Sequence, residues 1–185
     1  AYLQRNWDKR DILIIAAVAS VLDGVFLVSL RFLDVLPDNG DPRLLIILVS
    51  TGVLSAGIAV VQGIIAASLI ADTLDDHELR TGYRQEAMFN AALSFSGKAI
   101  SGVGIMMGGL VLTLIKFPTN VLPSEIPSQT ITSLGFTVGI ALPLLHFIPI
   151  YLITRYKITR SAYAEIREKL DRQYAESEAS PQTNA

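Results

Sequence analysis

Residues 44–71 read LLIILVSTGVLSAGIAVVQGIIAASLIA and contain no Asp, Glu, Lys or Arg. A bilayer core about 30 Å thick is crossed by roughly 20 helical residues that each rise about 1.5 Å. The stretch is therefore long enough to span a membrane. Helices of soluble proteins rarely reach this length without an amphipathic period, and none is evident here. We interpret this segment as a transmembrane helix.

Three further segments are long and nearly uncharged, at residues 12–33, 87–115 and 131–154. The 185-residue chain is 51% hydrophobic and 17% charged, which alone would also suit a soluble domain. Its charges, however, gather between the four segments. The first segment is not a signal peptide, because it is too long, lacks a small-residue cleavage site and precedes three more spans. We predict an all-α membrane protein with four transmembrane helices.

Basic residues are concentrated on one side of the predicted spans. Eleven lie in the amino-terminal segment, the connection at residues 72–86 and the tail, against three in the other two connections. By the positive-inside rule, both ends and the 72–86 loop are cytoplasmic. We expect a multi-pass protein of the cell membrane. The predicted layout is a cytoplasmic segment 1–11, a transmembrane bundle 12–154, a cytoplasmic amphipathic helix 155–175 and a disordered tail 176–185.

The amphipathic helix is predicted from spacing. Tyr163, Ile166, Leu170 and Tyr174 recur three and four residues apart, which places them on one helical face. Such a helix would lie at the membrane surface or against the cytoplasmic face of the bundle.

Enzyme chemistry has no support in the sequence. The absence of cysteine excludes disulfides, thiolate metal sites and a thiol nucleophile. We find no His/carboxylate metal spacing, nucleophile elbow or phosphate-binding loop. We therefore expect no catalytic residue, no metal and no cofactor. The net charge of −2 argues neither for nor against nucleic acid.

Lys98 is the most informative residue. It lies eleven residues into the third span, about 16 Å at ~1.5 Å per residue, and so near the bilayer midplane. An ammonium there costs ~3 kcal/mol or more and should face a protein interior or a water-filled cavity with an acidic partner. We favour a place in a substrate or ion pathway over a structural ion pair or a strained snorkel.

Asp23 poses the same problem in the first span. Lys98 and Arg31 are candidate partners, and protonation or a bound water are alternatives. We include Asp23 as a weaker pathway candidate. For Gln62 and His146, a helix–helix hydrogen bond is a commoner role than a ligand contact.

Small and rigid residues mark packing and bending. Gly104 and Gly108 have the GxxxG spacing that lets helices approach closely. Pro143 and Pro149 should kink the last span, because each lacks a backbone N–H donor.

The loop between the second and third spans, residues 71–86, reads ADTLDDHELRTGYRQE. Asp72, Asp75 and Glu78 are three residues apart, so a helical extension of the second span would align them. Thr81-Gly82 should then end the helix, ahead of Arg84 and Glu86.

The pattern Ala-Asp-x-x-Asp-x-x-Glu-x-x-Thr-Gly-x-Arg-x-Glu resembles the signature between the tenth and eleventh helices of the glycoside–pentoside–hexuronide:cation symporters. These are melibiose-permease-like carriers of the major facilitator superfamily. Lys98, fourteen residues after Arg84, matches a lysine in that family's eleventh helix. The stretch 156–170 is similar to the family's tail. The resemblance implies that the four spans are helices nine to twelve of a twelve-helix fold.

The resemblance also implies roles. Asp72, Asp75, Glu78, Arg84 and Glu86 would form a cytoplasmic gate network that makes and breaks contacts with the amino-terminal half. Lys98 would approach acidic residues of the sugar and cation sites on helices outside this chain. Because the ninth helix is peripheral in this fold, Asp23 is the weaker candidate. The chain begins at Ala1 in a charged segment, and we expect an upstream part.

The leading hypothesis is the carboxy-terminal part of a secondary active transporter that moves a sugar with Na⁺ or H⁺ by alternating access. Its partners would be a small solute, the lipid bilayer and the amino-terminal half of the same transporter, with no nucleic acid. One alternative is a carrier of a non-sugar solute such as a lipid. The other is a non-transporting membrane protein with the same fold.

Overall fold

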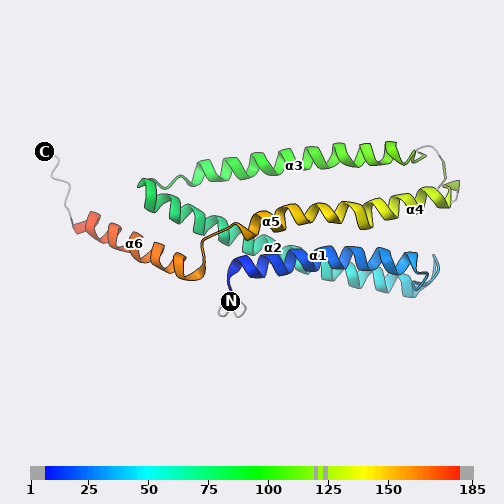
Figure 1. Ribbon diagram of the computed structural model, residues 1–185, viewed down its shortest axis with the longest axis horizontal. Helices are drawn as coiled ribbons and strands as arrows, with labels where there is room; N and C mark the ends of the chain where they lie inside the picture. The colour runs from blue at the N-terminus through cyan, green and yellow to red at the C-terminus, as the bar shows by residue number, and fades with distance from the viewer. Residues whose placement is uncertain (1–6, 119–120, 123–124, 180–185) are drawn as a thin grey trace.

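The computed structural model describes residues 7–118, 121–122 and 125–179 (Figure 1). Its elements follow the apolar segments in order, with no strand in these ranges. Four helices are long and apolar enough to cross a membrane, which confirms the all-α prediction. The elements are α1 (Lys9–Phe32), α2 (Pro42–Thr81), α3 (Glu86–Leu114), α4 (Ser128–Phe136), η3 (Thr137–Ala141), η4 (Leu142–His146), α5 (Phe147–Thr154) and α6 (Arg160–Ala179).

Helix α2 is longer than its apolar segment. The Asp41 side chain caps its start by accepting the Arg43 N–H at 2.8 Å. Nothing between residues 72 and 81 interrupts the backbone hydrogen bonds, so most of the predicted 72–86 loop is helical. Gly82 ends the helix with a φ of 75°, the left-handed conformation that glycine adopts without strain. The break at Thr81-Gly82 therefore lies where the sequence indicated.

The tail also differs from its prediction. Helix α6 begins at Arg160 and continues to Ala179, so residues 176–179 are helical rather than disordered. Charged residues at i, i+4 spacing, such as Glu165–Lys169 at 2.6 Å, support a polar helix of this length. The rest of the predicted disordered tail, residues 180–185, lies outside the described ranges, as do residues 1–6 of the predicted cytoplasmic segment.

Helices α1 and α2 are joined by polar side chains as well as by apolar packing. Gln62 Nε2 donates to the Ala16 carbonyl and to Ser20 Oγ, each at 2.8 Å. Ser55 Oγ donates to the Asp23 carboxylate. Such bonds satisfy polar groups that water cannot reach in a bilayer. The predicted helix–helix role of Gln62 is confirmed.

The last span is not a uniform α-helix. It passes from α4 through the π-helical turn η3 and the 3₁₀ turn η4 into α5. Pro143 lies in η4 and lacks the N–H that an α-helix would bond to residue 139, which accounts for the change in winding there. Pro149 lies in the first turn of α5, directly after η4, and α5 continues past it. The predicted disruption is therefore seen at Pro143 and not at Pro149.

Glycines bring the last span close to α1, at positions other than those predicted. A Cβ at Gly139 would lie 2.3 Å from Val28 Cγ2, and one at Gly135 would lie 3.2 Å from the Phe32 ring. These two glycines have the small-xxx-small spacing. Gly104 and Gly108 have the same spacing, but nothing lies within 4 Å of a Cβ built on either. The packing role of Gly104 and Gly108 therefore stays a prediction, and no helix among the described residues is their partner.

Replacing Gly139 by alanine is expected to lower the thermal unfolding midpoint in detergent. The added methyl overlaps Val28, whose β-branched side chain cannot turn away, and overpacking of this kind costs about 1–3 kcal/mol. Gly104→Ala is the matched control, because its methyl meets open space. Adding Val28→Ala to Gly139→Ala should restore much of the loss. Equal midpoints for the two single variants would contradict the close α1–η3 contact.

Candidate functional site

Three acidic residues form a row along the last turns of α2. Asp72, Asp75 and Glu78 are only 3%, 5% and 8% exposed. The spacing of three places them on one face of the helix, as predicted. Carboxylates this buried are stable only when paired and hydrogen-bonded. We call these three residues the carboxylate row.

Asp72 is paired with the amino-terminal segment. Lys9 Nζ lies 2.7 Å from both Asp72 oxygens. The same ammonium lies 4.8 Å from the centre of the Tyr163 ring, a cation–π contact. Lys9 therefore links α1, the carboxylate row and α6.

Asp75 is surrounded by donors from two directions. Arg84 Nη1, just before α3, lies 3.3 Å from Oδ1. From α6, the Tyr163 hydroxyl donates to Oδ2 at 3.0 Å and Arg167 Nη1 lies 3.6 Å from that oxygen. Asp75 is thus where the α2–α3 connection and the tail helix converge.

Arg84 holds the far end of the row. Its Nη1 also lies 3.0 Å from Glu78 Oε2, and its Nε donates to Glu86 Oε1 at 2.6 Å. The hydrogen bond to Glu86, together with the one to Glu78, raises the pKa of Arg84 despite partial desolvation. Tyr174 of α6 donates to the other Glu78 oxygen. One guanidinium therefore bridges three carboxylates, a geometry that Arg provides and Lys does not.

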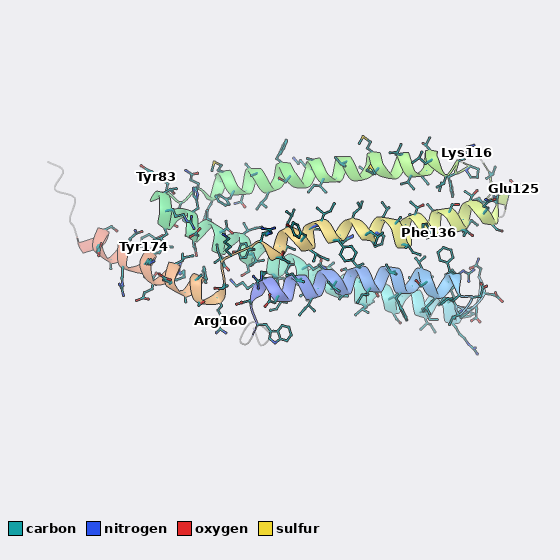
Figure 2. The ribbon with its side chains drawn as sticks, viewed as in Figure 1. Tyr83, Lys116, Glu125, Phe136, Arg160 and Tyr174 are labelled. Carbon is teal, nitrogen blue, oxygen red and sulfur yellow. The ribbon has the colours of Figure 1, made fainter. Side chains whose placement is uncertain are left out.

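The tail helix covers the carboxylate row with the predicted face. Ile166 is 8% and Leu170 1% exposed, and α6 packs on α2. Of the two locations left open by the sequence, the structure places this helix against the bundle. Figure 2 shows Tyr174 on α6 and Lys116 at opposite ends of the molecule. Lys9 and Arg167 were not predicted as members of the network, and Tyr163 and Tyr174 were expected only as packing residues.

The docked Tyr163 should titrate late. Burial and its hydrogen bond to Asp75 raise the pKa of Tyr163 from about 10 to about 12. Below pH 10 the tyrosine is neutral whether α6 is docked or free, so its stabilising contribution is fully present. It is lost as the pH rises from about 10 to about 12, because the free tyrosine ionises first. Tyrosinate absorbance should show one transition near 12 that disappears in Tyr163→Phe. If the transition that disappears is instead near 10, the bond to Asp75 is absent.

The two pathway candidates lie apart from this network. Lys98 is in the middle of α3 with an exposed side chain, and no carboxylate of the described residues pairs with it. Asp23 lies in α1 and is bonded to Ser55, not to Lys98 or Arg31. Arg31 donates instead to the Pro37 carbonyl and Asn39 Oδ1 at the end of α1. The structure thus gives Asp23 a helix-pairing contact and leaves Lys98 facing outward from this chain.

A family model described as MFS/sugar transport protein matches residues 1–160. The chain belongs to this family. Membership and the four apolar helices make it a multi-pass membrane protein of a transporter family. Comparisons with curated proteins and with solved structures gave no match. In the described part of this carrier, no three His, Asp or Glu side chains are grouped to hold a metal ion.

Proposed function

We propose that this chain is the carboxy-terminal part of a sugar:cation symporter of the glycoside–pentoside–hexuronide type, working by alternating access. The observation that carries the proposal is the carboxylate row at the end of α2. Its motif spacing is that of the symporter signature, and its charges are held by residues from three other segments, Lys9, Arg84 and Arg167. A solvated loop would not bury acids to this extent.

Multiple ion pairs suit a gate because they can be exchanged. In the state described here, the carboxylate row is satisfied within this chain by α1, the α2–α3 connection and α6. Basic residues on the other half of the carrier would compete for the same oxygens when the two halves rock together. Because buried carboxylates cannot stay unpaired, the two sets of contacts would define two discrete states. By positive-inside bias, this gate is cytoplasmic and both chain ends are inside.

Lys98 supports the cation-coupled part of the proposal. Its exposed position in the middle of α3 would place an ammonium where the rest of the carrier closes on this helix. Carboxylates at a midplane sugar and cation site would be neutralised by Lys98 or by Na⁺ or H⁺, but not fully by both. Binding of the cation at that site would then shift the conformational equilibrium of the carrier, which is how a cation gradient drives solute movement.

The test is a substrate panel in vesicles that contain the intact carrier. Labelled glycosides, pentosides and hexuronides are offered under an imposed Na⁺ or H⁺ gradient, with an amino acid and a labelled phospholipid as other solute classes. We expect accumulation of at least one sugar class that collapses when an ionophore dissipates the gradient. Movement of the phospholipid alone would replace the sugar assignment. Movement of none of the solutes would indicate a non-transporting member of the fold.

A further inference from the structure

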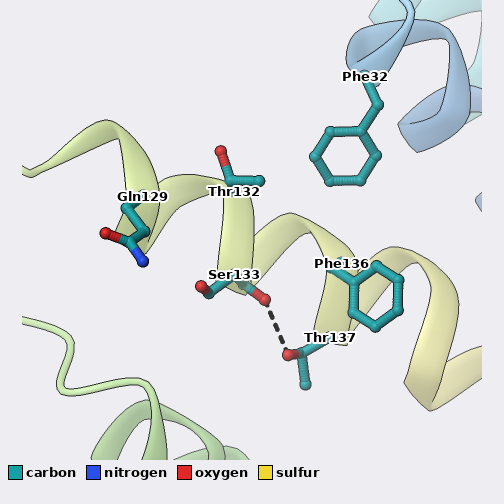
Figure 3. Close-up of a pocket in the computed structure, with 6 residues that line it drawn as sticks. All are labelled: Phe32, Gln129, Thr132, Ser133, Phe136 and Thr137. Carbon is teal, nitrogen blue, oxygen red and sulfur yellow. Dashed lines mark hydrogen bonds between the residues drawn. The ribbon is translucent and has the colours of Figure 1, made fainter.

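A groove opens between α1 and the last span at the end of the molecule remote from α6. Gly139 of the last span is in tight contact with Val28 of α1, and the Phe32 ring of α1 still lies close to Gly135. Beyond that point the helices diverge and leave two adjoining cavities of about 880 and 530 Å³, which share Phe32 and Thr132. Figure 3 shows the Phe32 ring directed toward the α4 residues Thr132 and Phe136. We call this wedge the α1–α4 groove.

The groove has the depth of one membrane leaflet. Its closed end is at Gly139 and its open end at Ser128, eleven residues along the span. At ~1.5 Å per residue this is about 16 Å, close to half of a hydrocarbon core of about 30 Å. The walls of the larger cavity are mainly apolar, including Leu27, Leu44, Leu48 and Ile131. An acyl chain is the occupant that matches this length and chemistry.

Two opposite charges stand at the mouth. Arg31 and Asp34 both line the larger cavity, yet the two side chains form no ion pair with each other. Arg31 donates one hydrogen bond from each of its two terminal nitrogens. Nη1 donates to the Pro37 carbonyl at 3.2 Å, and Nη2 donates to Asn39 Oδ1 at 3.1 Å. A guanidinium has five N–H groups, so donors remain. The mouth therefore offers a cation to an incoming phosphate.

Asp34 is held in place by the end of α1. It adopts a φ of 53°, and the following residue, Val35, donates its N–H to the Leu30 carbonyl at 3.1 Å. This is the hydrogen bond of a Schellman helix end. The Asp34 carboxylate has no side-chain partner within the described ranges. A carboxylate fixed beside a cavity can accept hydrogen bonds from a primary ammonium.

We propose that the α1–α4 groove binds a phospholipid with a zwitterionic ethanolamine headgroup. One acyl chain lies between Phe32 and α4, the phosphate is bound by Arg31, and the ammonium is bound by Asp34. A phosphatidylglycerol offers the phosphate but no ammonium, and Asp34 repels its charge. A choline headgroup has no N–H to donate. The site shares no residue with the carboxylate row and does not include Lys98.

The proposal is tested by lipid titration of the intact carrier in mild detergent, followed by native mass spectrometry. We expect one phosphatidylethanolamine to bind about tenfold more tightly than phosphatidylglycerol, since its ammonium adds a charge-assisted hydrogen bond to Asp34. Arg31→Gln should weaken binding of both lipids roughly tenfold. Asp34→Asn should remove the preference for phosphatidylethanolamine. Thr132→Trp, which fills the groove without touching the charges, should prevent retention.

Matched controls lie at the same end of the molecule. Lys116 also follows a helix end with a φ of 53°, and Asp38 lies in the same α1–α2 connection as Asp34, but neither lines the groove. Lys116→Gln and Asp38→Asn should leave binding unchanged. The proposal would be overturned if the two lipids bound with equal affinity, or if the control variants lost as much affinity as the groove variants. It would also be overturned if no lipid were retained, as when another helix of the carrier covers the groove.

Discussion

Replacing Lys98 by glutamine is expected to abolish cation-coupled sugar uptake while the protein still reaches the membrane. Lys98 lies in the middle of the 29-residue α3 and is exposed on this chain. Its ammonium would therefore pair with carboxylates on helices that close on α3. Removing one partner of a buried pair costs about 3–5 kcal/mol, which corresponds to a hundredfold or more in an equilibrium. The measurement is initial uptake into vesicles under an imposed Na⁺ or H⁺ gradient.

Lys98→Arg and Lys116→Gln are the controls for this prediction. Arginine keeps the charge at the midplane and should retain part of the coupled uptake. Lys116 follows the end of α3, so its neutralisation changes the same net charge without reaching the midplane. It should leave uptake unchanged. Normal gradient-driven accumulation by Lys98→Gln would remove Lys98 from the transport pathway and leave it a structural role.

The features predicted correctly depend on local sequence. Apolar length alone placed the four spans, because a bilayer imposes it on every spanning helix. The spacing of Asp72, Asp75 and Glu78 predicted a shared face, and Thr81-Gly82 predicted the end of α2. These follow from helix geometry and from the conformational freedom of one glycine.

The features missed depend on which helices meet. Lys9 and Asp72 are 63 residues apart, and Tyr163 and Asp75 are 88 apart, so no spacing rule connects them. The pair Gly135 and Gly139 packs on α1, whereas Gly104 and Gly108 meet nothing at the same spacing. Likewise, the Asp23–Ser55 bond depends on the register of α1 on α2. Sequence supplies the capacity for such contacts, and tertiary packing decides which are made.

The uncovered side of α3 has a consequence for the resemblance to symporters. Val111 is its one buried residue among those described, although α3 is as long as a bilayer requires. A lysine and several glycines on such a helix are explained if further helices cover it. The sequence motif and the bare α3 surface, on which Lys98 is exposed, therefore support the same proposal, one from sequence and one from structure.

Reversing Arg84 to glutamate is expected to slow transport turnover by at least tenfold. Arg84 bridges Asp75, Glu78 and Glu86 at 3.3, 3.0 and 2.6 Å. A carboxylate in its place adds a fourth negative charge to a partly buried cluster, and like charges at this range repel by more than the roughly 1.4 kcal/mol that a tenfold effect needs. The state in which the network is closed would lose population, so the step that closes the gate becomes slow. Substrate affinity should change less than turnover, because the solute site is expected at the midplane.

Arg80→Glu is the matched control for this reversal. Arg80 lies in the last turn of α2, four residues before Arg84, but its side chain is 74% exposed and pairs only with Asp76, at 2.9 Å and i,i+4 spacing. Surface pairs of this type contribute about 0.3–0.5 kcal/mol, so its reversal should leave turnover nearly unchanged. Arg84→Lys keeps the charge but cannot bridge three carboxylates and should give an intermediate rate. The measurements are solute exchange rate and substrate binding on the same preparation. An Arg84→Glu carrier that turns over at the normal rate would show that the carboxylate row is a structural anchor for α6 and not a gate.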